Sequence, residues 1–128
     1  MATQIRVLLA EDSEVMRRAI TSLLVNDRTV SLIGEVSSYP ELLEKLTESG
    51  PDVVLIDVHM PGLREAESFK DQLRHACLLA MSFWADEETS RLAEGFGAFR
   101  LLDKCELVQT LIPTIHECVQ QNGKSQPA

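Results

Sequence analysis

Short apolar runs alternate with amphipathic segments along the whole chain. Residues 5–10 and 53–56 are almost continuously apolar and contain β-branched residues, which is typical of strands buried on both faces of a parallel sheet. Runs of the same kind, some less regular, cover residues 30–36, 77–81 and 98–102. The pattern therefore predicts five strands.

The segments between these runs carry apolar residues at helical spacing. The predicted helices follow Ser13, begin at Pro40-Glu41, cover residues 64–75, begin at the acidic residues 86–88, and cover residues 106–121. Gly50-Pro51 ends the second of these helices, and Gly95 or Gly97 ends the fourth. Pro113 lies inside the last helix, where we expect a kink or a break.

Strands that alternate with helices imply right-handed βαβ crossovers and a parallel sheet covered on both faces. We predict an α/β fold: a three-layer, doubly wound, five-stranded parallel sheet of the flavodoxin-like (βα)5 type. Ligands of such open sheets bind beyond the carboxyl ends of the strands. The residues at those ends are Glu11-Asp12, Ser37-Ser38, Asp57, Ser82 and Asp103-Lys104. Carboxylates, a hydroxyl and an ammonium group should therefore share one edge of the sheet.

Length and charge narrow the class of protein. The chain has 128 residues, which suits one domain of common size. It has 12 Lys and Arg against 20 Asp and Glu, and the formal net charge of −8 argues against direct binding to nucleic acid or an anionic membrane. The sequence shows neither a long apolar span nor the layout of a signal peptide. We expect one cytoplasmic domain over residues 1–121 and a polar C-terminal tail over residues 122–128.

The three cysteines, Cys77, Cys105 and Cys118, are widely spaced. An odd number at such spacing shows neither a disulfide framework nor a zinc-binding pattern. We expect three separate thiols in the core or at the surface, of which only Cys105 lies near the predicted site.

Four short motifs at the predicted strand ends occur together. They are the acidic pair in Leu9–Ser13, the segment Ile56–Gly62, Met81-Ser82, and Leu102–Lys104. In this order, they resemble the receiver domain of two-component response regulators. The resemblance covers roughly residues 4–121 of this chain. Each residue alone has an ordinary explanation, because Glu11-Asp12 and Ser82 are common helix caps and Lys104 is a common surface lysine.

The resemblance implies a phosphoacceptor function. Asp57 would receive a phosphoryl group from a phosphohistidine of a sensor histidine kinase or a phosphotransfer protein. The Lys104 ammonium and the Ser82 hydroxyl would each contact a phosphoryl oxygen, and movement of the hydroxyl would switch the loop that follows it. Such a domain is not an enzyme beyond its own phosphorylation and autodephosphorylation.

A metal ion is expected at the same place. Two like charges at 4 Å repel by about 4 kcal/mol at an effective dielectric constant near 20, so clustered carboxylates need a cation nearby. Mg²⁺ suits oxygen ligands and joins carboxylates to phosphate. By resemblance, Asp12 and Asp57 would bind it directly, Glu11 through water, and His59 through its backbone carbonyl.

The resemblance also implies a surface for partners. The fourth helix, fifth strand and fifth helix would bind an output domain or a second copy of the chain. A receiver domain of this kind binds neither nucleic acid nor membrane by itself.

Several residues depart from the usual receiver pattern. Cys105 stands where a proline with a cis peptide bond is usual, so we expect a trans bond, or a strained one. Leu101 stands at the usual aromatic switch position, so that gate is absent or is provided by Phe99. The segment from Met60 to Ser82 is also a few residues shorter than usual.

Two large residues, Phe83 and Trp84, follow Ser82, where a small residue is usual. In receivers, the side chains at the positions of His59 and Trp84 control the access of the water that hydrolyses the aspartyl phosphate. We expect rings there to slow hydrolysis, unless Trp84 simply packs on the fourth helix.

Three other functions are compatible with parts of this pattern. The chain could be a pseudo-receiver that binds partners without phosphorylation, or the receiver fragment of a helix-turn-helix transcription factor. An aspartate-nucleophile phosphatase needs a second acid two residues after the nucleophile, where this chain has His59, so we set that function aside.

Overall fold

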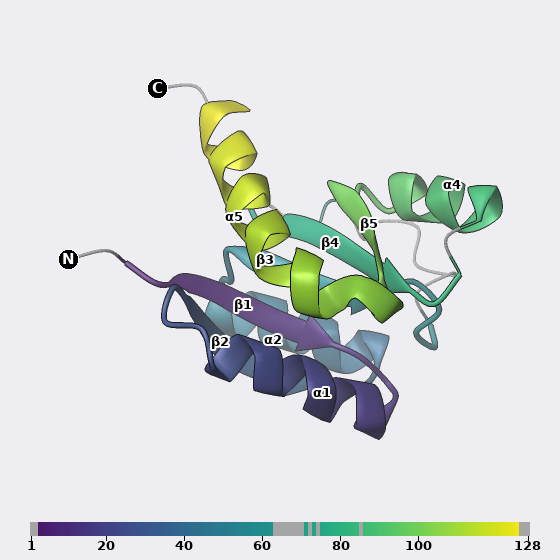
Figure 1. Ribbon diagram of the computed structural model, residues 1–128, viewed down its shortest axis with the longest axis horizontal. Coiled ribbons are helices and arrows are strands. Elements are labelled where there is room, and N and C mark those ends of the chain that lie inside the picture. The colour runs from purple at the N-terminus through teal and green to yellow at the C-terminus, as the bar shows by residue number, and fades with distance from the viewer. Residues whose placement is uncertain (1–2, 63–70, 72, 74, 85, 126–128) are drawn as a thin grey trace.

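The protein is built around a five-stranded parallel sheet. The structure, a computed structural model, describes residues 3–62, 71, 73, 75–84 and 86–125 (Figure 1). The strand order is β2-β1-β3-β4-β5, and every pair of neighbours is parallel. The strands are β1 (Ile5–Ala10), β2 (Val30–Val36), β3 (Val53–Asp57), β4 (Cys77–Ser82) and β5 (Arg100–Asp103). The predicted fold class is confirmed.

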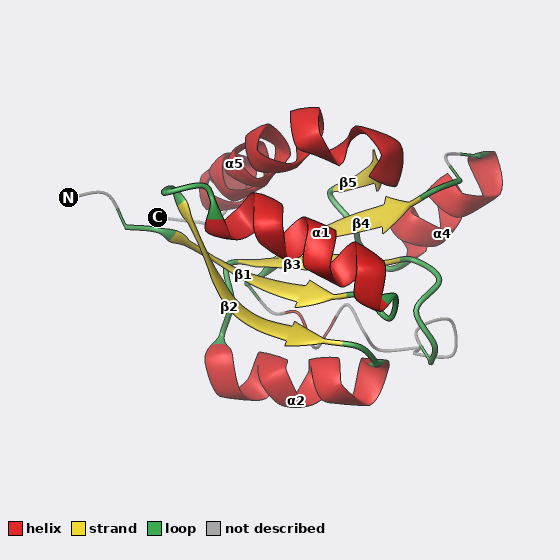
Figure 2. Cartoon of the chain, turned by 60° about the horizontal axis from the view of Figure 1, so that its bottom comes forward, coloured by secondary structure: helices red, strands yellow, loops and turns green. Residues whose placement is uncertain are grey.

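Helices cover both faces of this sheet (Figure 2). The described helices are α1 (Glu14–Val25), α2 (Tyr39–Ser49), α4 (Glu87–Gly95) and α5 (Leu107–Ser125), with a 3₁₀ turn at Lys104–Glu106. The helices α1 and α5 lie on one face of the sheet, and α2 and α4 lie on the other. The buried residues accordingly form two clusters, one on each face. Ile20, Leu24, Leu111 and Ile115 belong to the first cluster, and Leu42 and Phe96 to the second. None of the described helices combines the length and apolar character needed to span a membrane.

Local signals in the sequence explain where the helices begin. The Ser13 hydroxyl accepts a hydrogen bond from Met16 N, the Ser38 hydroxyl one from Glu41 N, and the Asp86 carboxylate one from Thr89 N. These caps satisfy amide groups that a helix leaves unpaired in its first turn. Gly50 ends α2 with a φ of 54°, a left-handed conformation that glycine adopts without strain. The helix starts at Ser13, Pro40-Glu41 and residues 86–88 were therefore predicted from local chemistry.

Gly34 lies directly after a bulge in β2 and does not interrupt the strand. Val7 pairs with Leu32 and Leu8 pairs with Gly34, so one extra residue lies on β2 between them. A Cβ atom at Gly34 would lie 3.2 Å from Leu8 Cδ1. The glycine therefore permits close approach to β1, and the strand continues to Val36 as predicted.

Two element boundaries differ from the prediction. The strand β5 begins at Arg100, because Gly97 turns the chain with a φ of 86° and pairing with β4 starts at Arg100 opposite Leu79. The last helix is not broken at Pro113 and continues past Gln121 to Ser125. Proline has no backbone N–H, so one carbonyl group in the preceding turn of the helix has no amide partner. Because Pro113 is exposed, that carbonyl group faces solvent. The predicted helix over residues 64–75 falls largely outside the described residues, of which Leu73 is buried.

The expectation of three separate thiols is wrong. Cys77, the first residue of β4, and Cys118 in α5 form a disulfide, with Cα atoms 6.2 Å apart. The sheet topology explains the pairing, because α5 packs along β4 and brings together residues 41 apart in sequence. Cys105 is exposed and free.

Candidate functional site

Strand order brings the predicted site residues to one edge of the sheet. The strands β1, β3, β4 and β5 lie side by side, and residues near their carboxyl ends pair with one another: Ala10 with Ile56, Asp57 with Met81, and Ser82 with Asp103. We call this the site edge. Ser37 and Ser38 follow the outer strand β2 instead, where Ser38 caps α2, so these two serines serve the helix start.

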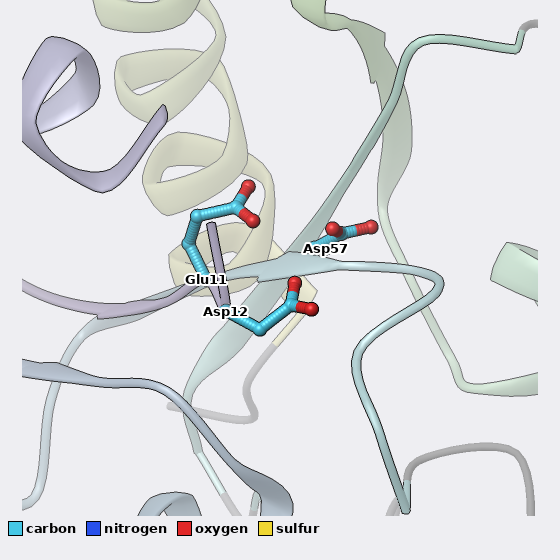
Figure 3. Close-up of side chains that lie close together, drawn as sticks. All are labelled: Glu11, Asp12 and Asp57. Carbon is cyan, nitrogen blue, oxygen red and sulfur yellow. The ribbon is translucent and has the colours of Figure 1, made fainter. Parts of the chain in front are cut away.

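Three carboxylates lie close together at the site edge. One oxygen from each of Glu11, Asp12 and Asp57 lies within 4.8 Å of the others (Figure 3). Glu11 is fully buried, Asp57 is 8% exposed, and Asp12 is exposed. The loop backbone orients two of them: Glu11 Oε2 accepts a hydrogen bond from Ser13 N, and Asp57 Oδ1 accepts one from His59 N. The cluster is therefore built into the strand ends and is open to solvent at Asp12.

Lys104 supplies the positive charge that this cluster requires. Its Nζ lies 2.5 Å from Glu11 Oε1 and 3.1 Å from Asp57 Oδ2, and its side chain is 4% exposed. The Phe83 ring covers the ammonium group, with its centroid 5.2 Å from Nζ. A buried ammonium is stable only where charges and hydrogen bonds compensate its lost hydration, and two carboxylates and a ring do so here.

The balance of charge at the site edge favours a divalent cation. Three carboxylates face one ammonium, which leaves an excess of two negative charges when all are ionised. Burial raises the pKa of Glu11, the Lys104 interaction opposes that rise, and the charge of Asp57 adds to it. The three oxygens are the hard ligands that Mg²⁺ prefers, so the residues present fit that ion.

Ser82 and the two rings near it form the other side of the site. Ser82 is buried, and its Oγ accepts a hydrogen bond from Trp84 N at 2.9 Å. Trp84 is 62% exposed and meets the His59 ring edge to face, with centroids 5.6 Å apart. Both rings line a pocket of about 170 Å³ beside the first turn of α4. Trp84 is therefore not buried against α4 but forms a ring pair with His59.

Asp103 explains how the chain positions Lys104 without the usual proline. The Lys104-Cys105 peptide bond is trans, as no described peptide bond is cis. Asp103 Oδ1 accepts a hydrogen bond from Cys105 N at 2.8 Å and caps the 3₁₀ turn that begins at Lys104. This role of Asp103 was not predicted, although an Asp directly before a turn is a recognisable capping signal in the sequence.

Phe99 and Leu101 pack in different halves of the core. Phe99 packs with the half of the core under α1 and α5, and Arg100 lies over its ring. Leu101 packs with the other half. The two side chains therefore lie on opposite sides of the sheet. Phe83, by contrast, has a contact in the site that sequence analysis missed, and its unusual size was the available signal.

Comparison with known proteins relates this geometry to a family. A family model for the response regulator receiver domain matches residues 7–116. The chain is similar to the response regulator GacA of Pseudomonas viridiflava, with 40% identity over 70 residues, or 55% of this chain and 33% of that protein. It is also similar to the DNA-binding transcriptional activator DevR/DosR of Mycobacterium tuberculosis, with 32% identity over 87 residues, or 65% and 40% of the two chains. The matches thus span well under half of these relatives.

A solved structure shows the same fold. The signal receiver domain of a response regulator named NarL from Mycobacterium tuberculosis superposes with a TM-score of 0.82 and 22% identity. The superposition covers 91% of this chain and 97% of that one. At this identity the likeness concerns the fold alone.

Proposed function

The chain belongs to the response regulator receiver domain family of two-component systems, and we propose that Asp57 is its phosphoacceptor. The observation that supports this most is the position of the Lys104 ammonium between the Glu11 and Asp57 carboxylates, with Asp12 beside them. An isolated aspartate at a strand end does not need a buried ammonium group and two further carboxylates beside it. A carboxylate that accepts a multiply charged phosphoryl group does need such charged neighbours.

Phosphoryl transfer at Asp57 needs positioning and charge stabilisation more than covalent chemistry. A carboxylate oxygen of Asp57 forms the new P–O bond while the P–N bond of a donor phosphohistidine breaks, and the electron pair of that bond stays on the imidazole. Lys104 contacts Asp57, so its ammonium would be close to an oxygen of a group transferred to that carboxylate. Its ammonium would stabilise charge that develops during transfer.

The acidic cluster is the proposed magnesium site. Asp12 and Asp57 would hold Mg²⁺ directly, Glu11 through water, and His59 through its backbone carbonyl. Bound there, Mg²⁺ would neutralise one phosphoryl oxygen. Exposure of Asp12 leaves the site open on the side from which a partner must approach.

Ser82 is the proposed link between phosphorylation and output. Its Oγ accepts a hydrogen bond from Trp84 N. If the Ser82 hydroxyl turned towards a phosphoryl oxygen, the loop before α4 would therefore move with it. We propose that this motion alters the face formed by α4, β5 and α5, which would bind an output domain or a second copy. A sensor histidine kinase or a phosphotransfer protein would be the donor.

We further propose that the domain covers residues 1–121, followed by a polar tail over residues 122–128, and that it is located in the cytoplasm. We propose that the domain binds neither nucleic acid nor a membrane directly.

The phosphoacceptor assignment is tested with a small donor. Incubation with Mg²⁺ and acetyl phosphate should add one phosphoryl group, as measured by intact-mass spectrometry, and Asp57→Asn should abolish the addition. Asp52→Asn is the matched control, because Asp52 is an exposed carboxylate at the amino end of β3. Absence of any adduct with acetyl phosphate and with a kinase would favour the phosphorylation-independent pseudo-receiver instead.

The magnesium assignment has its own measurement. Asp12→Asn removes a charged oxygen ligand, so the Mg²⁺ titration midpoint should rise markedly. The indole fluorescence of Trp84, the chain's single tryptophan, reports the titration. Equal midpoints for the two proteins would exclude Asp12 as a ligand.

A further inference from the structure

The amino end of β4 carries a cysteine that is paired with α5, at the edge of the sheet opposite the site edge. Cys77 begins β4 and Cys118 lies in the second half of α5. The two sulfurs are joined, Cys118 is fully buried, and Cys77 is 7% exposed. Neither sulfur takes part in the chemistry proposed for Asp57.

A groove gives solvent access to this pair. Both cysteines line a cavity of about 390 Å³, together with Gly97, Phe99 and Gln121. Gly97 turns the chain there with a φ of 86° and adds no side chain to the wall. Since Cys77 retains some exposure and Cys118 none, an external reagent would meet Cys77 first.

We propose that Cys77 and Cys118 are a reversible dithiol–disulfide pair that gives this receiver domain a redox input separate from phosphorylation. The oxidant is a low-molecular-mass disulfide of the glutathione class. The Cys77 thiolate attacks one sulfur of oxidised glutathione, which forms a mixed disulfide and releases one reduced glutathione. The Cys118 thiolate then attacks the Cys77 sulfur and releases the second. The two cysteines lose two electrons and two protons in total, and the two released glutathione molecules take them up as thiols.

The location of the pair determines what the bond would control. It closes the chain between residues 77 and 118, which includes β4, α4, β5 and the 3₁₀ turn that carries Lys104. This segment includes the loop before α4, α4 and β5, which are proposed to respond to phosphorylation. Glu11, Asp12 and Asp57 lie outside the closed segment. Oxidation would therefore restrain the responding elements while it leaves the acidic cluster as it is.

Cys105 provides an internal comparison within the same chain. It is exposed and free, yet local desolvation and the nearby Asp103 raise the pKa of its thiol. The thiolate is the reactive form, so exposure alone does not make Cys105 a better nucleophile. It also has no partner sulfur, so oxidation there stops at a mixed disulfide or links two chains.

The test uses the Cys105→Ser protein, in which only the pair remains, alongside the unmodified chain. After equilibration with oxidised glutathione, alkylation and intact-mass spectrometry should find no free thiol and a loss of two hydrogen atoms, and peptide mapping should join Cys77 to Cys118. Dithiothreitol should restore both thiols. Retention of two free thiols, or a mixed disulfide that never resolves, would overturn the proposal.

The thermal stability of the oxidised and reduced forms of the same protein provides an independent measurement. Closing a loop of this length restricts the unfolded chain, so the thermal midpoint of the oxidised form should exceed that of the reduced form by roughly 10 °C. The control is Cys105→Ser with Cys118→Ala, whose midpoint should not respond to the same treatments. Equal midpoints for the oxidised and reduced forms of the paired protein would also contradict the proposal. Neither measurement depends on whether Asp57 is phosphorylated.

Discussion

The two ends of β4 are both buried but are held in place by different forces. At its carboxyl end, Ser82 adjoins three carboxylates, an ammonium group and two rings. At its amino end, Cys77 is joined to α5 by a covalent bond and lies among apolar residues of the core. One end depends on charges that must remain balanced, and the other on packing and a disulfide.

The charged end of β4 is therefore suited to switching, and the apolar end to stabilising the fold. The carboxylates at the site edge repel one another, and Lys104 only partly compensates them, so their arrangement is sensitive to a cation or a phosphoryl group. The α5 side of the core is uncharged and should be indifferent to both. A domain organised in this way can rearrange the loop after Ser82 without losing its core. Each of the following substitutions tests one end against the other.

Lys104→Met should have the largest effect, and it should act on the site edge alone. Methionine keeps an unbranched side chain but removes the ammonium, so phosphorylation by acetyl phosphate should slow about 10²–10³-fold, as when one charge-stabilising donor is lost. Mg²⁺ binding should persist, because the carboxylates remain. Stopped-flow tryptophan fluorescence measures both quantities.

The control for Lys104→Met is Lys45→Met. Lys45 is an exposed lysine of α2 that pairs with Glu48, so its loss should leave the phosphorylation rate unchanged. If Lys104→Met also left the phosphorylation rate unchanged, the Lys104 ammonium would have no part in phosphoryl transfer.

Ile115→Ala should produce the opposite result. Ile115 is a fully buried residue of α5, and removing its side chain leaves a cavity that should lower the free energy of unfolding by about 3 kcal/mol. Urea denaturation measures this loss, and Ile115→Val should show about 1 kcal/mol. The folded fraction should still be phosphorylated at the normal rate. A slowed rate would show that the two ends of the sheet are coupled.

Trp84→Ala should have the smallest effect, and only on the lifetime of the phosphorylated state. The ring pair of Trp84 and His59 beside Ser82 is suited to hinder the water that attacks the aspartyl phosphate. Its removal should speed hydrolysis about tenfold, which corresponds to about 1.4 kcal/mol. Phosphoprotein decay after donor removal measures this, at one Mg²⁺ concentration.

Val108→Ala is the matched control for Trp84→Ala, because it removes an exposed apolar side chain from α5 instead of the β4–α4 loop. Its decay rate should equal that of the unmodified protein. If Trp84→Ala decayed no faster than this control, the ring pair would have no part in the reset.

Much of the molecule was predictable from sequence because the relevant forces act over a few residues. Buried strands follow from short apolar runs, as for Val53–Ile56, and helix starts follow from capping residues such as Ser13 and Asp86. Alternation of these elements implies a parallel sheet, and a parallel sheet places strand ends together. Asp57, Asp12 and Lys104 could therefore be assigned to one edge before any coordinates were known.

Only the tertiary structure decided which groups meet across the chain. Lys104 contacts Glu11 more closely than it contacts Asp57, and Phe83 covers its ammonium group. Neither the Glu11 contact nor the Phe83 contact follows from spacing in the sequence. The Cys77–Cys118 bond was missed for the same reason, since two residues 41 apart are joined only because α5 lies along β4. Sequence patterns report each residue's local environment and the face it buries, whereas strand order and helix packing determine which distant side chains become neighbours.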